Sequence, residues 1–487
     1  MKKTTILTSI CALFTACSSN IQVEQTLSTH PAITPDYIGV TVPVNIAPLH
    51  FGVPDSCKVT QLNAIFRSGN KQMTVRGSHQ IAPSASEWKE LMQEADDSIQ
   101  VCIQVEKEGK WKEYAPFPIY VKKDKIDSHL AYRLIEPGYE IWNEMGIYQR
   151  CLENFDESAI LTNKMTGYGC MNCHSFHKHN PDKMMLHLRV DYGGTYLIDQ
   201  GNIEKLNTKT PQTQYALVYP SWHTSGDYIA FSVNNTKQMF HTTDPNRIEV
   251  MDFASNVVVY DVKRHEIFTA PQLFSPTSFE TFPNFSPDGK TLYFCSADSV
   301  AMPSDYKQVK YSLCSIAYDA ESRTFGTQVD TLFHAQKENK SVSFPRVSPD
   351  GKYLMFTLSS YGNFSIWHKE ADLYLADLQS REIRPMQTLN SADVESYHSW
   401  SSNGRWVVFS SRRENGLYTQ PFIAYIDENG QAHKPFLLPQ KDIQYYDKLM
   451  KSFNVPEFVS GKVHTDGYSI SRTAKTSAGI DVTFHKN

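Results

Sequence analysis

One pattern of apolar and polar positions recurs along the chain from about residue 170 onward. In each copy an apolar residue precedes Pro or His, a polar residue, a second apolar residue, a Ser-Pro-Asp-Gly-like turn and an alternating strand. Proline presets φ at such a turn and glycine accepts a positive φ, so these turns are typical of β-hairpins. The alternation after each turn predicts a strand that buries one face. The clearest copies are YPSWHTSGDYIAFS from Tyr219, FPNFSPDGKTLYFC from Phe282, FPRVSPDGKYLMFT from Phe344 and YHSWSSNGRWVVFS from Tyr397.

Two fainter copies complete the set. Cys173-His174-Ser175-Phe176 matches the start of the copy at Tyr397, and Val455-Pro456-Glu457-Phe458 matches the start of the copy at Phe282. Spacings of 46 to 63 residues between the apolar markers each hold a four-stranded blade with its loops. The repeats therefore predict a six-bladed β-propeller over residues 135–465. The markers are Phe176, Trp222, Phe285, Val347, Trp400 and Phe458.

The last copy leaves little chain for the outer strands of its blade. Residues 140–162, EIWNEMGIYQRCLENFDESAILT, have the pattern of two outer strands with a turn at Asn154–Ser158. We expect them to pair with an inner strand at 455–463. Both ends of the propeller segment then meet in one blade, and closure hides sheet edges that would otherwise favour aggregation.

The N-terminal part of the chain has a different pattern. Short alternating stretches separated by turns over residues 36–125 predict an Ig-like β-sandwich. SASEWKELMQEA interrupts them as a helix with Ser84 or Ser86 as its cap and Trp88, Leu91 and Met92 as its apolar face. The predicted fold class is therefore all-β, with a sandwich, a propeller and a C-terminal tail at 466–487.

The first residues have the features of an export signal. Met1-Lys2-Lys3 is basic, ILTSICALFTA is apolar but too short to span a bilayer, and LFTAC is similar to a bacterial lipobox. This predicts a signal peptide at 1–17, a lipid on Cys17 and a polar tether at 18–35. The alternative is an ordinary cleaved signal with an incidental cysteine. The expected location is the bacterial cell envelope, periplasmic or at the outer membrane, with a membrane as partner through the lipid.

Charge and cysteine content add two points. The formal net charge of -5 comes without a basic stripe, which argues against a nucleic-acid partner. Export places the cysteines in an oxidising compartment. Two pairs, Cys57 with Cys102 and Cys295 with Cys314, are therefore candidates for disulfides.

The Ser-Pro-Asp-Gly-Lys repeats resemble the WD40-like repeats of TolB-type six-bladed propellers. The chain also resembles a group of bacterial exported lipoproteins that carry a CxxCHSF segment before a TolB-like propeller. This resemblance implies location and architecture, whereas a propeller can be a scaffold, a receptor or an enzyme.

The segment GYGCMNCH contains CxxCH, the attachment motif of c-type haem. Two thiols, Cys170 and Cys173, would bond the two vinyl groups on one porphyrin edge, and His174 would be the proximal iron ligand. Candidates for a sixth ligand are Met184, Met185 and His187, although Met184–Leu188 also fits a buried strand. This interpretation predicts haem c and a role in electron transfer, with a redox partner, or in small-ligand sensing.

Three alternatives remain open for the same residues. Zinc has possible ligands in Cys170, Cys173, His174, His177 and His179. A structural Cys170–Cys173 disulfide would leave a TolB-like propeller that binds a protein or glycan partner. The motif can also arise by chance. The sequence has no GxSxG, HExxH, P-loop or strand-linked GxGxxG. The absence of these motifs argues against a hydrolase.

Repeat symmetry predicts two rings of residues near the central channel. They are candidates for binding a ligand at the channel mouth, but an Arg346–Glu457 pair also fits a structural role, and His398 fits a bond to a neighbouring blade. The first ring is His174, Pro220, Pro283, Pro345, His398 and Pro456, and the second is Ser175, Ser221, Asn284, Arg346, Ser399 and Glu457.

Overall fold

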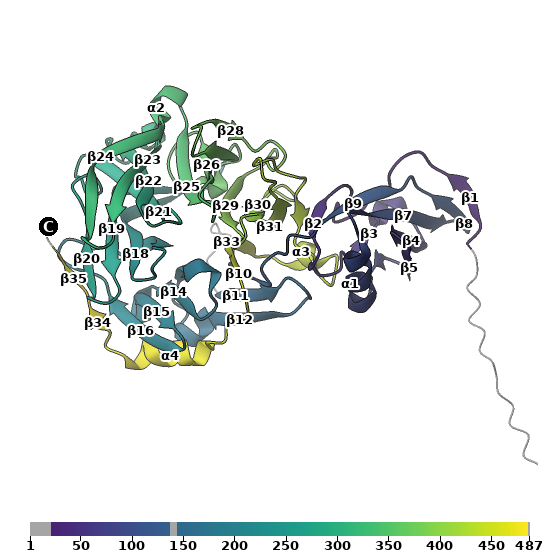
Figure 1. Ribbon diagram of the computed structural model, residues 1–487, viewed down its shortest axis with the longest axis horizontal. Helices are drawn as coiled ribbons and strands as arrows, with labels where there is room; N and C mark the ends of the chain where they lie inside the picture. The colour runs from purple at the N-terminus through teal and green to yellow at the C-terminus, as the bar shows by residue number, and fades with distance from the viewer. Residues whose placement is uncertain (1–20, 137–143, 486–487) are drawn as a thin grey trace, which may run out of the picture.

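A computed structural model describes residues 21–136 and 144–485 (Figure 1). The protein is almost entirely β, as predicted. The helices of these ranges are short, and none of them is long and apolar enough to cross a membrane. The α-helices are α1 (Ala85–Glu94), α2 (Ala335–Glu338), α3 (Tyr445–Lys448) and α4 (Gly467–Thr476).

The N-terminal part forms a seven-stranded sheet and a two-stranded sheet. Helix α1 begins where predicted, because the Ser84 side chain accepts a hydrogen bond from the Glu87 amide at 3.4 Å. Its buried side chains are the predicted Trp88, Leu91 and Met92. The strands are β1 (Val23–Thr26), β2 (Thr41–Pro43), β3 (Phe51–Gly52), β4 (Gln61–Ser68), β5 (Lys71–Gly77), β6 (Gln80–Ile81), β7 (Ser98–Lys107), β8 (Lys110–Glu113) and β9 (Phe117–Lys122).

The described residues that follow form six sheets, each built on four antiparallel strands. Figure 1 shows them arranged in a ring, with β21, β25, β29 and β33 toward its middle. In chain order the first three are β10 (His129–Ile135), β11 (Met145–Cys151) and β12 (Glu157–Thr162) with β33 (Ser452–Val459); β13 (Met171–Phe176), β14 (Lys183–Leu188), β15 (Gly194–Asp199) and β16 (Asn202–Asn207); and β17 (Leu217–Trp222), β18 (Tyr228–Phe240), β19 (Ile248–Asp261) and β20 (Glu266–Phe268). The other three are β21 (Ser278–Phe285), β22 (Thr291–Asp298), β23 (Ser312–Asp319) and β24 (Thr324–Phe333); β25 (Ser341–Val347), β26 (Tyr353–Ser359), β27 (Asp372–Asp377) and β28 (Ile383–Pro385); and β29 (Glu395–Trp400), β30 (Trp406–Ser411), β31 (Gln420–Tyr425) and β32 (Phe436–Leu437).

One sheet joins the two ends of the ring. Its strand order is β12-β11-β10-β33, so three strands come from residues 129–162 and the fourth comes from the C-terminal part. Leu130 lies opposite Phe458 in this pairing. The two predicted segments therefore lie in one sheet, but the expected direct pairing is wrong, because β10 lies between β11 and β33. The sequence analysis missed β10, and residues 137–143 of the predicted outer-strand segment lie outside the described residues.

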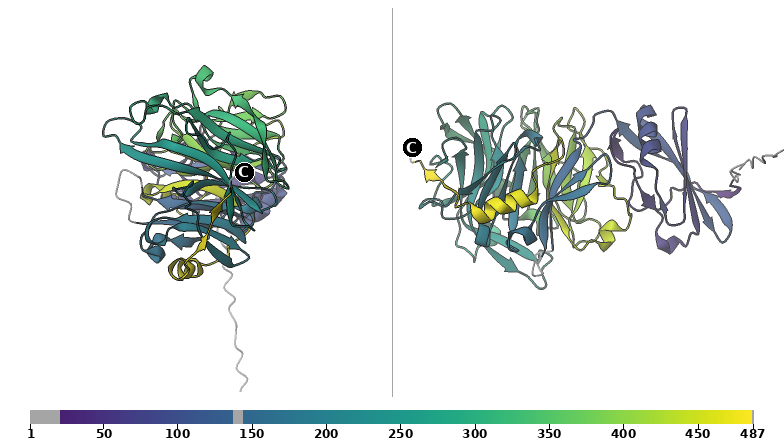
Figure 2. Two further views of the ribbon diagram at one scale, coloured as in Figure 1. Left: turned by 90° about the vertical axis from the view of Figure 1, so that its left-hand side faces the viewer. Right: turned by 90° about the horizontal axis from the view of Figure 1, so that it is seen from below.

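The predicted tail has structure of its own. After α4, the short strand β34 (Ile480–Asp481) pairs in parallel with β16, and β35 (Thr483–Phe484) pairs in parallel with β20. Figure 2 shows α4 on the outside of the ring. The tail thus adds a fifth, outer strand to two neighbouring sheets.

The N-terminal part and the ring share one hydrophobic core. Buried side chains of β4, β7 and α1 belong to the same cluster as side chains of β29, β30 and β31. Hydrogen bonds cross the same boundary, from Trp406 Nε1 to the Asp124 carbonyl at 2.9 Å and from the Tyr37 hydroxyl to the Leu437 carbonyl at 3.3 Å. The two parts therefore pack as one body.

A left-handed residue interrupts five of the inner strands at the same place. The φ angles of these residues lie between 51° and 53°, and the pairing register shifts beside each of them. The residues are Tyr219, Phe282, Phe344, Tyr397 and Val455. Four of them meet as rings in the channel, with centroids 4.2 Å apart for Tyr219–Phe282 and Phe282–Phe344 and 4.8 Å apart for Phe344–Tyr397. We call these four the channel ring cluster.

The two candidate disulfide pairs outside the CxxCH motif are absent. Cys57, Cys102, Cys295 and Cys314 are free cysteines. On β22 and β23, Cys295 lies opposite Leu313 and Cys314 lies opposite Phe294. Because neighbouring positions of a strand point to opposite faces, the two thiols lie on different sides of the sheet.

Candidate functional site

The CxxCH motif coincides with the bulge of an inner strand. The register of β13 against β14 shifts between Asn172 and Ser175, at the place where the other inner strands carry their left-handed residues. The His174 side chain is only 2% exposed, and neither ring nitrogen makes a hydrogen bond of regular geometry. Burial, with a smaller effect of the Arg133 charge, lowers the pKa of His174 to about 3. The imidazole is therefore neutral and enclosed.

The proposed sixth ligands do not converge on His174. Met184 and Met185 are fully buried and belong to two different cores, because they lie on opposite faces of β14. His187 Nδ1 is 3.2 Å from Thr195 Oγ1, and burial lowers the pKa of His187 to about 3. The donor set therefore does not fit a haem iron.

The structure also argues against the disulfide and the zinc site considered for the same motif. Cys170 is a free cysteine, so the predicted structural disulfide with Cys173 is absent. Within residues 21–136 and 144–485, no group of three His, Cys, Asp or Glu side chains is placed to hold a metal ion such as zinc. The position of the Cys173 side chain is not among the described features.

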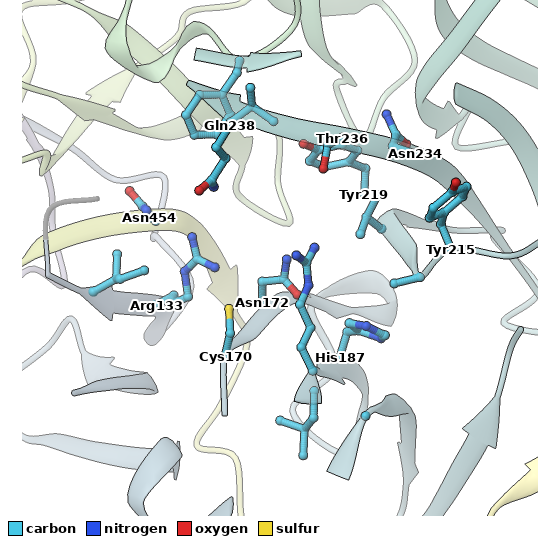
Figure 3. A pocket seen from close by; sticks show the side chains of 18 of the residues that line it. Arg133, Cys170, Asn172, His187, Tyr215, Tyr219, Asn234, Thr236, Gln238 and Asn454 are labelled. Carbon is cyan, nitrogen blue, oxygen red and sulfur yellow. The ribbon is translucent and has the colours of Figure 1, made fainter. Parts of the chain in front are cut away.

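A cavity of about 780 Å³ opens at one end of the channel. We call it the mouth pocket. Figure 3 shows Gln238, Thr236 and Asn234 along one strand on one side of it, with Arg133, Cys170 and Asn172 on the other side. Its lining residues come from well-separated parts of the chain, among them Arg133, Cys170, Asn172, His187, Tyr215, Asn234, Thr236, Gln238, Trp367, Arg412 and Asn454.

The mouth pocket is positively charged. Arg133, Arg189, Lys209 and Arg412 line it, against the single carboxylate of Glu136 among the described lining residues. The charges of Arg189 and Lys209 add to burial in lowering the pKa of His187, as expected from a positive potential at this place. The pocket is therefore suited to an anionic group.

Two polar side chains of the pocket have unused hydrogen-bonding atoms. Arg133 donates from Nη1 to the Met171 carbonyl at 3.2 Å, but its buried Nε has no partner among the described residues. The buried Oδ1 of Asn172 also has none there. An unsatisfied buried polar atom costs about 1–3 kcal/mol, so these atoms favour a polar ligand or water.

Two buried carboxylates hold the loop that forms another wall. Glu249 accepts hydrogen bonds from the Tyr361 hydroxyl and from His368 Nε2, the latter at 3.2 Å. Asp252 accepts from Asn363 Nδ2 and from the Tyr311 hydroxyl, the latter at 2.7 Å. The loop held in this way carries Phe364, Ile366 and Trp367 into the mouth pocket.

A smaller cavity of about 290 Å³ lies at the other end of the channel, where the two predicted rings of residues gather. Their polar side chains join neighbouring sheets. Ser221 Oγ accepts from the Phe285 amide at 3.0 Å, and Asn284 Oδ1 accepts from the Val347 amide at 2.9 Å. Glu457 Oε1 accepts from the Phe176 amide at 3.0 Å and so links β33 to β13, the inner strand of the next sheet.

The charge state of Glu457 follows from its place in this ring. Burial raises its pKa to about 8, and the positive charge of Arg346 opposes that rise. The carboxyl group is therefore largely protonated at neutral pH. The contacts described here join neighbouring sheets, so this ring of residues forms a structural belt.

A serine–histidine contact near the same cavity is also structural. His223 Nδ1 and Ser225 Oγ are 2.9 Å apart. They stand where Ser286 and Asp288 make the corresponding contact in the next repeat, at 2.6 Å. Because both contacts close the same turn, the pair at His223 needs no catalytic role to explain it.

His398 confirms the predicted bond to a neighbouring sheet and provides a test of it. Its Nε2 donates to the Met355 carbonyl at 2.9 Å, and burial lowers its pKa to about 3. The unfolded chain protonates this histidine near pH 6.5 and the folded chain does not, so its contribution to stability is lost as the pH falls below 6.5. We expect His398→Asn to be less stable than the wild type at pH 8, with the difference shrinking by about 1.4 kcal/mol per pH unit from pH 6 to 4. Urea unfolding at each pH measures this, and a pH-independent difference would contradict it.

Comparisons with known proteins add the following. No protein-family model matches the chain. Acylamino-acid-releasing enzyme 1 of Oryza sativa subsp. japonica is 24% identical over 249 residues, which are 46% of this chain and 29% of that protein. This chain thus spans less than a third of the curated relative's length.

Two solved structures illustrate the structural similarities. A Mycobacterium tuberculosis puromycin-hydrolyzing peptidase has a TM-score of 0.33 and 11% identity, over 71% of this chain and 52% of that chain. The β-propeller domain of the Trilobed protease from Pyrococcus furiosus has a TM-score of 0.32 and 13% identity, over 70% of this chain and 95% of that chain.

These comparisons correct the functional interpretation of the sequence. The curated relative is named as an acylamino-acid-releasing enzyme and not as a haem protein, and the donor geometry at His174 does not fit a haem iron. The prediction of haem c at Cys170, Cys173 and His174, with electron transfer or ligand sensing as its function, is therefore wrong. The preference against a hydrolase is wrong as well, because the curated relative is named as an enzyme that releases acylamino acids.

Proposed function

We propose that this protein acts on peptides, as a peptidase-type propeller that binds its peptide in the mouth pocket. The observation that carries the proposal is the cavity of about 780 Å³ with converging polar side chains at the channel mouth. Pockets of this size that combine apolar walls with a few placed polar groups are typical ligand sites.

The lining of the mouth pocket matches the chemistry of a peptide. Amide side chains of Asn172 and Gln238 each offer both a donor and an acceptor, as the peptide backbone does. Asn234 offers its buried Oδ1, because its Nδ2 donates to Asp252 at 2.9 Å. Trp367 and Phe364 add aromatic surface deeper in the wall. Val190 and Tyr215 are exposed apolar side chains at the rim, available to side chains of a bound peptide.

We further propose the finer architecture and location that the sequence predicts. The six sheets are the six blades of the propeller, and the N-terminal sheets form a β-sandwich. A lipid on Cys17, which lies outside the described residues, holds the protein at a membrane of the bacterial cell envelope. Cys17→Ser should then release the protein from the membrane fraction after cell fractionation.

Peptide binding is testable through the thiol that lines the pocket. Cys170 is free and partly exposed, whereas Cys295 and Cys314 are buried. A saturating mixed-sequence peptide pool should slow alkylation of Cys170 by N-ethylmaleimide at least about tenfold, because the ligand covers the thiol. Mass spectrometry of digests locates the label. The internal control is Cys57, which belongs to the N-terminal part and does not line the mouth pocket. Equal labelling of Cys170 with and without the pool, together with no cleavage of the pool, would contradict the proposed function.

A further inference from the structure

In the third sheet of the ring, the paired strands β18 and β19 are longer than the strands of the other sheets. β18 has 13 residues and β19 has 14, and they pair along their whole length. The inner strand β17 accompanies β18 only as far as Leu217 opposite Val233. Beyond Val233, β18 has β19 as its strand partner on one side and no strand on the other within the described chain.

The unpaired edge of β18 borders the mouth pocket. Asn234 and Asn235 both line the cavity although they are consecutive in the chain. The register against β19 shifts between Asn235 and Thr236, and three consecutive residues, Asn234 to Thr236, line the cavity where the strand runs along its border. Thr236 and Gln238 continue the same border (Figure 3). A strand edge offers backbone donors and acceptors that an extended peptide can use by adding as a further strand.

Positive charge lies across the pocket from that edge. Arg133 and Asn172 face Gln238 and Thr236 in Figure 3, and both carry the unused buried atoms described above. A carboxylate accepts short, charge-assisted hydrogen bonds from a guanidinium group. The four cations against one carboxylate among the described lining residues favour the carboxylate end of a peptide over its ammonium end.

The channel ring cluster explains why a chain end fits better than an internal segment. Its successive rings lie 4.2 to 4.8 Å apart, centroid to centroid, between the mouth pocket and the smaller cavity. A peptide that enters the mouth therefore meets packed aromatic side chains and not an open passage.

From these observations we infer that the mouth pocket takes the C-terminal end of an extended peptide, which adds as a strand to the edge of β18 and places its free carboxylate at Arg133. The inference rests on the proposed function and makes its substrate class specific. It requires no bond to form or break in the pocket.

Paired peptides test the carboxylate part without changing the protein. The probe is an uncharged octapeptide of Thr, Val and Ser with an N-terminal fluorophore, prepared as the free acid and as the C-terminal amide. We expect the amide to bind at least about tenfold more weakly in fluorescence polarisation, because it cannot accept charge-assisted bonds from the cation. A second free-acid peptide with N-methyl groups at alternate backbone positions should also lose at least about tenfold, because it cannot pair with a strand edge.

Protein variants then locate the effect. Arg133→Met should bring acid and amide to equal affinity, whereas Arg472→Met, an exposed arginine on α4, should keep the discrimination. If Arg133→Met does not fold, judged by circular dichroism, the paired peptides on the wild type still decide the matter.

The outcomes separate the two proposals. No binding of any peptide form would overturn the proposed function. Equal binding of acid and amide, or no effect of N-methylation, would overturn the inference while leaving peptide binding intact. An uronate oligosaccharide that binds more tightly than the free-acid peptide would also overturn it, since a glycan carries the carboxylate but cannot add as a strand.

Discussion

A chain that ends at Lys451 is expected to lose the folded ring. The truncation removes β33, whose Phe453 and Phe458 are fully buried, and leaves β10 without its partner. A single large buried side chain is worth about 3–5 kcal/mol, and the free edge of β10 is a template for aggregation. We expect oligomers in size-exclusion chromatography and no cooperative thermal transition in circular dichroism.

A shorter truncation is the matched control. A chain that ends at Ser477 keeps β33 and loses only β34 and β35, which pair through two residues each. It should remain monomeric and lose only a few °C in melting temperature, in keeping with a loss of about 1 kcal/mol. A monomeric, cooperatively folded chain ending at Lys451 would show that β33 does not close the ring.

Replacement of Asp252 is the second change with a large expected effect. Asp252→Ala leaves Asn234, Tyr311 and Asn363 without their common acceptor. Burial raises the pKa of Asp252 to about 6, above that of the unfolded chain. A raised pKa in an acid means that folding favours the protonated form, so the wild type gains most below about pH 4 and loses that gain as the pH rises through 6.

The expected result has a stability part and a binding part. The free energy of unfolding should fall by about 3 kcal/mol at pH 4, and the deficit should shrink toward pH 7. Peptide affinity should also fall, because Asn363 no longer holds the loop that carries Phe364 and Trp367. Asp298→Ala, an exposed position at the end of β22, should change neither quantity. A deficit that grows from pH 4 to 7 would contradict the assignment of a raised pKa.

Local chemistry explains which parts of the fold could be predicted. The Ser-Pro-Asp-Gly turns fix hairpins by backbone conformation alone, and in the structure Ser286 and Asp288 do bond within such a turn. The cap at Ser84 is local in the same sense. By contrast, β10 has no such turn beside it, and only its long-range pairing with β33 makes it part of the ring.

The functional site was harder to predict for a related reason. Cys170 and His174 are close in sequence, but the strand turns Cys170 toward the mouth pocket and encloses His174 at the other side of the bulge. A spacing motif cannot show which face each side chain takes. The mouth pocket itself joins Arg133, Gln238 and Asn454, whose proximity depends on the closed ring.

The core shared by the N-terminal part and the ring has a thermodynamic consequence. Side chains of α1 and of β30 belong to one cluster, and the Asp124 carbonyl and the Asp127 side chain hold β30 and the turn before it through Trp406 and Ser402. Exposing the interior of one part would therefore expose that of the other, so the boundary visible in the sequence near residue 125 does not divide the molecule into units that melt separately. The N-terminal part and the sheet of β29 to β32 should absorb heat in a single calorimetric peak, and any partial opening of the ring should begin on the opposite side, at the sheets of β17 and β21, whose buried side chains belong to other clusters.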